Sequence, residues 1–172
     1  VLSELINTIK YHDKPLGTIT GLIQNLLAKE ISKDSIKVAL TGTGSDEVFT
    51  GYYFHYLAHL KSLKDLNSDL FEKNLKYFKN FIHPFIRNAK FKAYDEYLNQ
   101  NTKEMILSND GLDLIEKDYF TEDKDSIINN RLINEYETDT LTSMLLNDVH
   151  TGSLKHLLTE EDLNFMNHSI EN

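Results

Sequence analysis

The spacing of apolar residues predicts two helices at the start of the chain. In VLSELINTIKYH, residues 1–12, leucine or isoleucine stands at positions 2, 5, 6 and 9, which lie on one face of a helix. Pro15 and Gly17 interrupt this pattern. A second helix begins near Thr18 or Thr20, either of which can cap it, and its apolar residues are Leu22, Ile23, Leu26, Leu27 and Ile31.

One later segment predicts a buried strand. IKVAL, residues 36–40, has apolar residues at alternate positions, and the glycine-rich turn TGTGS and a helical pattern follow it. This is the strand–turn–helix order of an α/β protein. Because a single strand cannot satisfy its own edges, we expect a short strand near 36–41 in a larger parallel sheet. Its partner strands would come from elsewhere in a longer protein or from another chain.

Beyond the turn the pattern is helical. Apolar residues at 48, 52, 56 and 60 form one series, and an amphipathic stretch covers 63–89 with an interruption at Pro84. The stretch is locally basic, and its aromatic residues are Tyr77, Phe78, Phe81 and Phe85. Such interleaving can mark a nucleic-acid surface, but in an acidic chain a core-facing aromatic stripe beside solvated lysines is favoured.

Two further helices are predicted toward the end of the chain. Residues 126–150 carry a long helical series that Gly152 stops. Thr159, with Asp162 three residues later, is similar to a capping box and predicts the start of the last helix. The segment should therefore be mostly α-helical, with one short strand.

Composition narrows the class of protein. A length of 172 residues suits one domain, and the net charge of -9 argues against general binding to nucleic acid or to an anionic membrane. No apolar run reaches the roughly 20 residues of a membrane span. The absence of cysteine excludes disulfides and fits a reducing compartment such as the cytoplasm. The chain begins inside a helical pattern without methionine, so we expect a fragment.

The segment TGTGSDE, residues 41–47, is the candidate for chemistry. Ligands of open α/β sheets bind beyond the carboxyl ends of strands, where glycines permit close approach and helix N–H groups favour anions. The adjacent acids Asp46 and Glu47 would repel a phosphate unless a divalent cation lies between, and Mg²⁺ is often held by one or two carboxylates plus phosphates. The alternative is structural: Ser45 caps a helix whose dipole the two acids complement.

Three segments, in order, carry a resemblance to a known family. LTGTGSDEVFTGYYFH resembles the asparagine synthetase signature L-S-G-E-G-x-D-E-x-F-x-G-Y. YHDKPLGT (11–18) is similar to the family's D-E-P segment, and LLTEEDLNFMNHSIEN (157–172) to its D-x-x-S-M-x-x-S-x-E-x-R block, ending before the arginine. The resemblance implies that 1–172 is part of the C-terminal, ATP-pyrophosphatase-type synthetase domain. The glutaminase domain and the S-G-G-x-D-S loop are absent, so the segment alone should be inactive.

The resemblance also implies an activity. A carboxylate, aspartate in the parent family, is adenylated with ATP and Mg²⁺, and ammonia from glutamine then displaces AMP to form the amide, as in asparagine biosynthesis. The expected partners are these small molecules, the rest of the protein's own chain and, as an open option, a second copy in a homodimer.

The same resemblance assigns roles in the turn. The nucleotide-binding residues it implies are Thr41, Gly42, Gly44 and Ser45. Asp46 would ligate Mg²⁺. Thr43 and Glu47 are the candidate catalytic residues, although Glu47 could equally support the helix start by hydrogen bonding. Gly51 is read as a backbone-permissive glycine and Tyr52 as a packing residue.

Two departures from the family pattern leave the acceptor open. Thr43 and Lys14 stand where the family usually has acids, and threonine cannot carry negative charge or act as a base near neutral pH. Amidation of another carboxylate, such as a sugar acid, is therefore an alternative to asparagine synthesis. A helical interaction module that keeps the signature only as ancestry is another.

Other polar pairs carry weaker signals. His55 and His59 share the histidine spacing of a zinc-binding helix, but no third ligand is identifiable, so partly exposed helix histidines are expected. The adjacent acids Glu160 and Glu161 are expected to be solvated helix positions.

Overall fold

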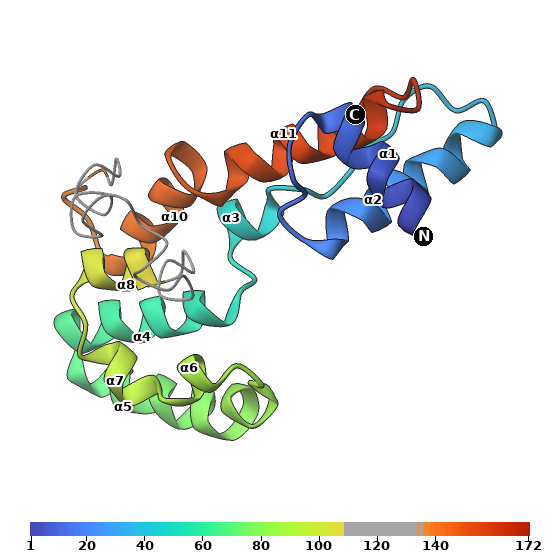
Figure 1. The fold of residues 1–172 in the computed structure, drawn as a ribbon. Helices are drawn as coiled ribbons and strands as arrows, with labels where there is room; N and C mark the ends of the chain where they lie inside the picture. The colour runs from blue at the N-terminus through green and yellow to red at the C-terminus, as the bar shows by residue number, and fades with distance from the viewer. Residues whose placement is uncertain (109–133, 135) are drawn as a thin grey trace, which may run out of the picture. The chain divides into compact units, whose positions relative to one another are not determined.

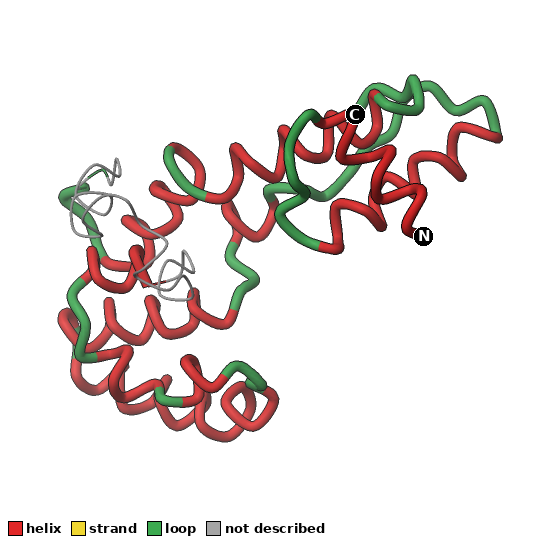
Figure 2. The backbone as a smooth tube through the Cα atoms, viewed as in Figure 1, coloured by secondary structure: helices red, strands yellow, loops and turns green. Residues whose placement is uncertain are grey.

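The computed structural model describes residues 1–108, 134 and 136–172. These form two compact units, and each is described by itself: the first comprises Val1–Ser45 with Gly152–Asn172, and the second Asp46–Thr151. Helices dominate both units, and no strand is drawn in the described part of the chain (Figures 1 and 2). The prediction of a mostly helical segment is confirmed. Among the described helices, none has the length and apolar character that crossing a membrane requires.

The first unit contains α1 (Leu2–His12), α2 (Ile19–Lys33) and α11 (Ser153–Met166). Both predicted N-terminal helices are confirmed, and Thr18 stands at the N-cap position of α2 in extended conformation. A small core forms where α2 and α11 pack together, around Ala28, Phe165 and Ile170.

The apolar face predicted for α1 is not the face that this unit buries. Leu2 is 70% exposed, whereas Thr8 and His12 are buried. Thr8 Oγ1 accepts a 2.8 Å hydrogen bond from the Asn25 side chain of α2, and Asn25 Oδ1 lies 2.6 Å from Nε2 of His168. The helices are thus joined by a buried polar network, which satisfies groups that would otherwise be costly to bury.

The short strand expected near 36–41, with its partner strands outside these residues, is present here only as a bridge. The segment forms one isolated parallel bridge, Val38 with Glu171, and the side chains of Ile36, Val38 and Leu40 are exposed, Leu40 at 98%. The bridge is made by two hydrogen bonds, Ala39 N to Glu171 O at 2.8 Å and Glu171 N to Lys37 O at 2.9 Å. A strand needs neighbours on its edges and faces to become buried, and the described residues of this unit provide one short contact.

The last helix begins earlier than predicted. α11 starts at Ser153, directly after Gly152, so Thr159 lies inside the helix and not at its N-cap. Its hydroxyl donates to the carbonyl oxygen of Lys155, one turn back, at 2.8 Å. This is the usual alternative for a threonine within a helix.

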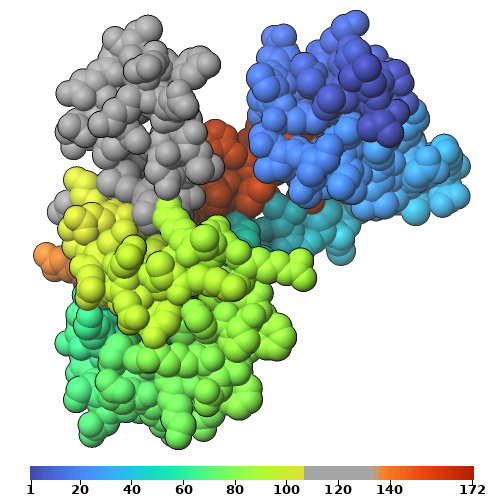
Figure 3. Space-filling view, turned by 60° about the horizontal axis from the view of Figure 1, so that its bottom comes forward, coloured from blue at the N-terminus to red at the C-terminus, as the bar shows by residue number. Residues whose placement is uncertain are grey.

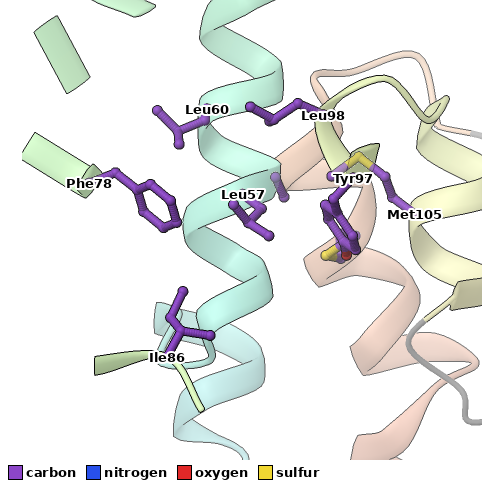
Figure 4. Packing of buried hydrophobic residues seen from close by; sticks show 9 residues of the cluster. Leu57, Leu60, Phe78, Ile86, Tyr97, Leu98 and Met105 are labelled. Carbon is purple, nitrogen blue, oxygen red and sulfur yellow. The ribbon is translucent and has the colours of Figure 1, made fainter. Parts of the chain in front are cut away.

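The second unit is built around α4 (Tyr53–Leu66), against which α10 (Thr140–His150) and α7 (Tyr94–Leu98) pack. Figure 4 shows Leu57 and Leu60 of α4 among buried side chains from several other elements. The remaining described helices are α3 (Ser45–Phe49), α5 (Ser68–Tyr77), α6 (Ala89–Lys92) and α8 (Thr102–Ser108), with a π-helical turn at Phe78–Ile82 and a 3₁₀ turn at His83–Phe85.

The helix boundaries predicted for this unit are partly confirmed and partly wrong. The series at 48, 52, 56 and 60 is not one helix, because the chain leaves helical geometry between α3 and α4, where Thr50 has a φ of 71°. The interruption near Pro84 is confirmed by the 3₁₀ turn that contains it. α10 begins at Thr140, and Asn134 and 136–139 are not helical; the rest of the predicted helix over 126–150 lies outside the described residues.

The aromatic residues near α5 do not form a core-facing stripe. Phe78 is buried, but Tyr77, Phe81 and Phe85 are 56–69% exposed in this unit. The change to a π turn after Tyr77 alters the angle between successive side chains, so helical spacing no longer reports one face. The green part of Figure 3 shows this stretch on the surface.

Candidate functional site

The turn at residues 41–45 belongs to the first unit, and its backbone needs glycine at one position in particular. Gly44 has a φ of 94°, a conformation that side chains with Cβ rarely adopt. A Cβ there would also lie 2.9 Å from Cδ1 of Leu154 in α11. By contrast, the nearest atom to a Cβ on Gly42 would be Oγ of Ser45 at 3.8 Å. Gly44 therefore sets the path of the turn against α11.

Ser45 does not act as a side-chain cap. It is the first residue of α3, and its hydroxyl donates back to the carbonyl oxygen of Gly42. α3 has only five residues, so its dipole is small. The structural alternative for Asp46 and Glu47, capping and dipole stabilisation, thus explains little of their presence.

Thr41 connects the turn to α11. Its Oγ1 donates a 3.1 Å hydrogen bond to Oε2 of Glu161, which is 3% exposed. The expectation that Glu161 is a solvated acid is therefore wrong. Thr41 itself is exposed, and Thr43 is half-buried in the turn.

Asp46, the first of the adjacent acids, belongs to the second unit and is exposed. Its carboxylate lies against the backbone of Gly51, and a Cβ at that position would overlap Oδ1 of Asp46. Glycine is needed here for this close approach. The backbone role predicted for Gly51 is therefore to leave room for the carboxylate of Asp46.

Glu47 has a different environment. It is 1% exposed, and its Oε1 accepts a 2.7 Å hydrogen bond from the hydroxyl of Tyr52. Burial raises the pKa of the Tyr52 phenol, and the hydrogen bond to Glu47 and the negative charge of that carboxylate raise it further. Tyr52 therefore remains a protonated donor, and its role is more than packing.

His55 holds the segment between these acids and α4. Its Nδ1 accepts hydrogen bonds from the backbone N–H groups of Gly51 at 3.1 Å and Tyr52 at 3.4 Å. A neutral imidazole that accepts at Nδ1 carries its proton on Nε2, which here faces Oδ2 of Asp148 at 3.5 Å. At 2% exposure His55 is buried, so the expectation of a partly exposed histidine is wrong for it, whereas His59 is exposed.

The two acids thus differ in what they can bind. The carboxylate of Glu47 is buried and engaged by Tyr52, while Asp46 presents an exposed carboxylate. One accessible carboxylate fits the mode in which Mg²⁺ takes most of its ligands from phosphates and water. Within the described ranges, no group of three or more His, Cys, Asp or Glu residues is arranged to hold a metal by protein ligands alone.

The contacts of three side chains in this region were not predicted from the sequence: those of Glu161, Asp148 and, as a buried group, His55. His55 follows Tyr52 by three residues, the spacing at which a side chain can return to the helix N-terminus, so its role had a local signal. Glu161 and Asp148 had none, because they are 120 and 93 residues from their partners Thr41 and His55.

Comparisons with known proteins agree with the signature. No curated protein and no solved structure matched the chain. The family model described as asparagine synthase matches residues 1–172, which is the whole of this chain. The chain therefore belongs to the asparagine synthase family, a family of ATP-dependent amide-forming ligases.

Proposed function

We propose that the protein containing this chain forms an amide from a carboxylate, ATP and glutamine-derived ammonia, with aspartate as the first acceptor to test. The observation that carries this proposal is Asp46, an exposed carboxylate held against Gly51 directly after the glycine turn of the family signature. Residues 1–172 would be part of a synthetase domain that acts in the cytoplasm.

The proposed reaction has two bond exchanges. An oxygen of the acceptor carboxylate attacks the α-phosphorus of ATP, and the bond to pyrophosphate breaks. The nitrogen of ammonia then attacks the acyl carbon, and AMP leaves with the electrons of the broken C–O bond. The turn residues Thr41, Gly42, Gly44 and Ser45 would bind the nucleotide. Asp46 would hold Mg²⁺, which offsets the negative charge of the phosphates.

The surroundings of the two candidate catalytic residues, Glu47 and Thr43, favour different roles for them. Glu47 is buried and bonded to Tyr52, which favours its supporting role over direct contact with substrate. Thr43 lies in the turn, where its hydroxyl could contact the acceptor but could not serve as a base. The exposed side chains of Ile36, Val38 and Leu40 suit a strand that joins a larger parallel sheet.

The test is pyrophosphate release by the full-length protein, which should require ATP, Mg²⁺ and an acid acceptor. Asp46→Asn should abolish this release while circular dichroism and the melting temperature stay unchanged. Asp95→Asn removes another exposed acid of the same unit and should retain activity. Full activity of Asp46→Asn would rule out its role as a metal ligand.

A second acceptor class is favoured by Thr43 and Lys14, which stand where the resemblance expects acids. We propose that a sugar acid, as in surface polysaccharides, is the alternative substrate. Comparing aspartate with uronic acids in the same assay separates the two. If neither acceptor supports release and ATP does not bind, the interaction-module alternative holds.

A further inference from the structure

α11 supports the nucleotide turn at two points on one of its faces. Leu154 lies against Gly44, and Glu161 accepts the hydrogen bond of Thr41. These residues of α11 are seven apart, about two helical turns, so they lie on the same side of the helix. Farther along the chain, Glu171 bonds to the backbone of residues 37 and 39. The C-terminal segment of the first unit therefore holds the extended segment and the turn along their length.

In the hydrogen bond between Thr41 and Glu161, Thr41 is the donor, and this limits which other groups its hydroxyl can bind. A threonine hydroxyl has one proton and two lone pairs, and an ionised carboxylate can only accept. Because the Thr41 proton is donated to Oε2 of Glu161, the hydroxyl has only lone pairs left for any other partner. Glu161 is buried and Thr41 is exposed, so a ligand would meet the hydroxyl and not the carboxylate.

We propose that Glu161 is a positioning residue that makes Thr41 a hydrogen-bond acceptor toward the nucleotide. The group that Thr41 recognises must then be a donor on the nucleoside, either a ribose hydroxyl or the exocyclic amine of adenine. An unprotonated phosphate oxygen is excluded as its partner, because it can only accept. This inference rests on the proposed binding of ATP at the turn.

The experiment measures binding of ATP and three analogues to the full-length protein by calorimetry. 2′-DeoxyATP and 3′-deoxyATP each lack one ribose donor, and ITP has a carbonyl oxygen in place of the amine. One of the three should bind about three- to tenfold more weakly than ATP, the effect of one hydrogen bond. The analogue that does so identifies the group that faces Thr41.

Variants test whether Glu161 sets this preference. Glu161→Ala frees the hydroxyl to rotate and donate, so the affinity ratio between ATP and that analogue should fall toward one. Thr41→Val, which removes the hydroxyl at similar volume, should do the same, and the double variant should match Thr41→Val. Glu161→Met keeps the side-chain length if the alanine variant does not fold. Glu160→Met, a change at the neighbouring acid of α11, should leave the ratio unchanged.

The outcomes separate this inference from the proposed function. A merely structural Glu161 would weaken ATP and all analogues equally, so an unchanged ratio in Glu161→Ala and Glu161→Met overturns the inference. Equal binding of all four nucleotides by the unmodified protein also overturns it, while pyrophosphate release would still support the ligase. Failure of ATP to bind at all would overturn both.

Discussion

The hydroxyl of Tyr52 donates a 2.7 Å hydrogen bond to Oε1 of Glu47. Glu47 lies in α3, and Tyr52 lies in the segment that follows this helix. Glu47 is buried and Tyr52 is partly buried, and the Tyr52 phenol has a raised pKa because of its burial and of Glu47. A charged carboxylate in such a place needs its donor, since an unpaired buried charge is strongly destabilising.

Tyr52→Phe removes that donor and leaves the rest of the ring. We expect the free energy of unfolding to fall by about 1.5–3 kcal/mol, the range for a hydrogen bond to a charged group. Urea denaturation measures this change. Tyr53→Phe is the matched control, because the neighbouring Tyr53 is 41% exposed and should lose little. Equal stability of the two variants would show that the hydroxyl of Tyr52 does not support Glu47.

Gly51→Ala should displace the carboxylate of Asp46, because the added Cβ would overlap its Oδ1. In the full-length protein, we expect pyrophosphate release to need a higher Mg²⁺ concentration for half-maximal rate. A Mg²⁺ titration of the assay measures this shift. Gly17→Ala is the control, since its Cβ would lie 3.6 Å from Oε2 of Glu160, an ordinary contact. An unchanged Mg²⁺ requirement in Gly51→Ala would contradict the placement of Asp46.

Asp139 caps α10 and should be a stabilising residue of the second unit. Its Oδ1 accepts hydrogen bonds from N–H of Leu141 at 3.0 Å and of Thr142 at 3.2 Å, and from the Ser62 hydroxyl at 2.9 Å. Burial alone would raise the pKa of this carboxyl, but the hydrogen bonds from Thr142, Ser62 and the backbone outweigh burial and lower it.

Asp139→Ala should therefore destabilise the protein by about 1–2 kcal/mol, the usual effect of losing an N-cap. Because the folded pKa is depressed, this contribution is present above the ordinary value of 3.8 and is lost as the pH falls through the folded pKa. Thermal unfolding between pH 3 and 7 tests both statements, and Glu137→Ala, at an exposed acid of the same loop, is the control. A destabilisation that persists undiminished at the lowest pH would contradict the linkage.

His12 should make the first unit less stable in mild acid. Burial lowers its pKa from the ordinary 6.5, against smaller opposing effects of Asn164 and Glu160. The unfolded chain then takes up a proton near pH 6.5 while the folded chain does not, so stability is lost as the pH falls below that value. His12→Gln should reduce the difference between unfolding at pH 7.5 and pH 5.5, and His156→Gln, at an exposed histidine, should not. Equal pH dependence in both variants would exclude His12 as the source.

The sequence predicted helices well where the evidence was local. The periodicity of 1–12 and of the segment after Thr18 reports amphipathic character over one continuous stretch, and both helices exist. It could not predict which face is buried, because the buried residues of the first helix are polar: Thr8, which bonds to Asn25, and His12. Polar residues leave no hydrophobic periodicity in the sequence.

The candidate site was predicted in its segment but not in its contacts. The residues of TGTGSDE follow one another in the chain, so the signature locates them without any knowledge of the fold. The roles of Glu161 and Asp148 depend on helices brought near by tertiary packing, which no local pattern encodes. The distinction between a buried Glu47 and an exposed Asp46 arises in the same way.

The left-handed backbone conformation of Thr50 also determines the directions in which the side chains before and after it point. In an uninterrupted α-helix, successive residues turn by about 100°, so two residues five apart point about 140° away from each other. Glu47 and Tyr52 are five apart, and the helix that the periodicity predicted would have directed their side chains to different sides. The hydrogen bond between them exists because the chain stops turning at Thr50, with a φ of 71°, and begins again at Tyr53. An inserted or deleted residue between Thr50 and Tyr52 would change the direction in which the Tyr52 side chain points, so we expect it to break the hydrogen bond to Glu47 although neither helix loses a residue.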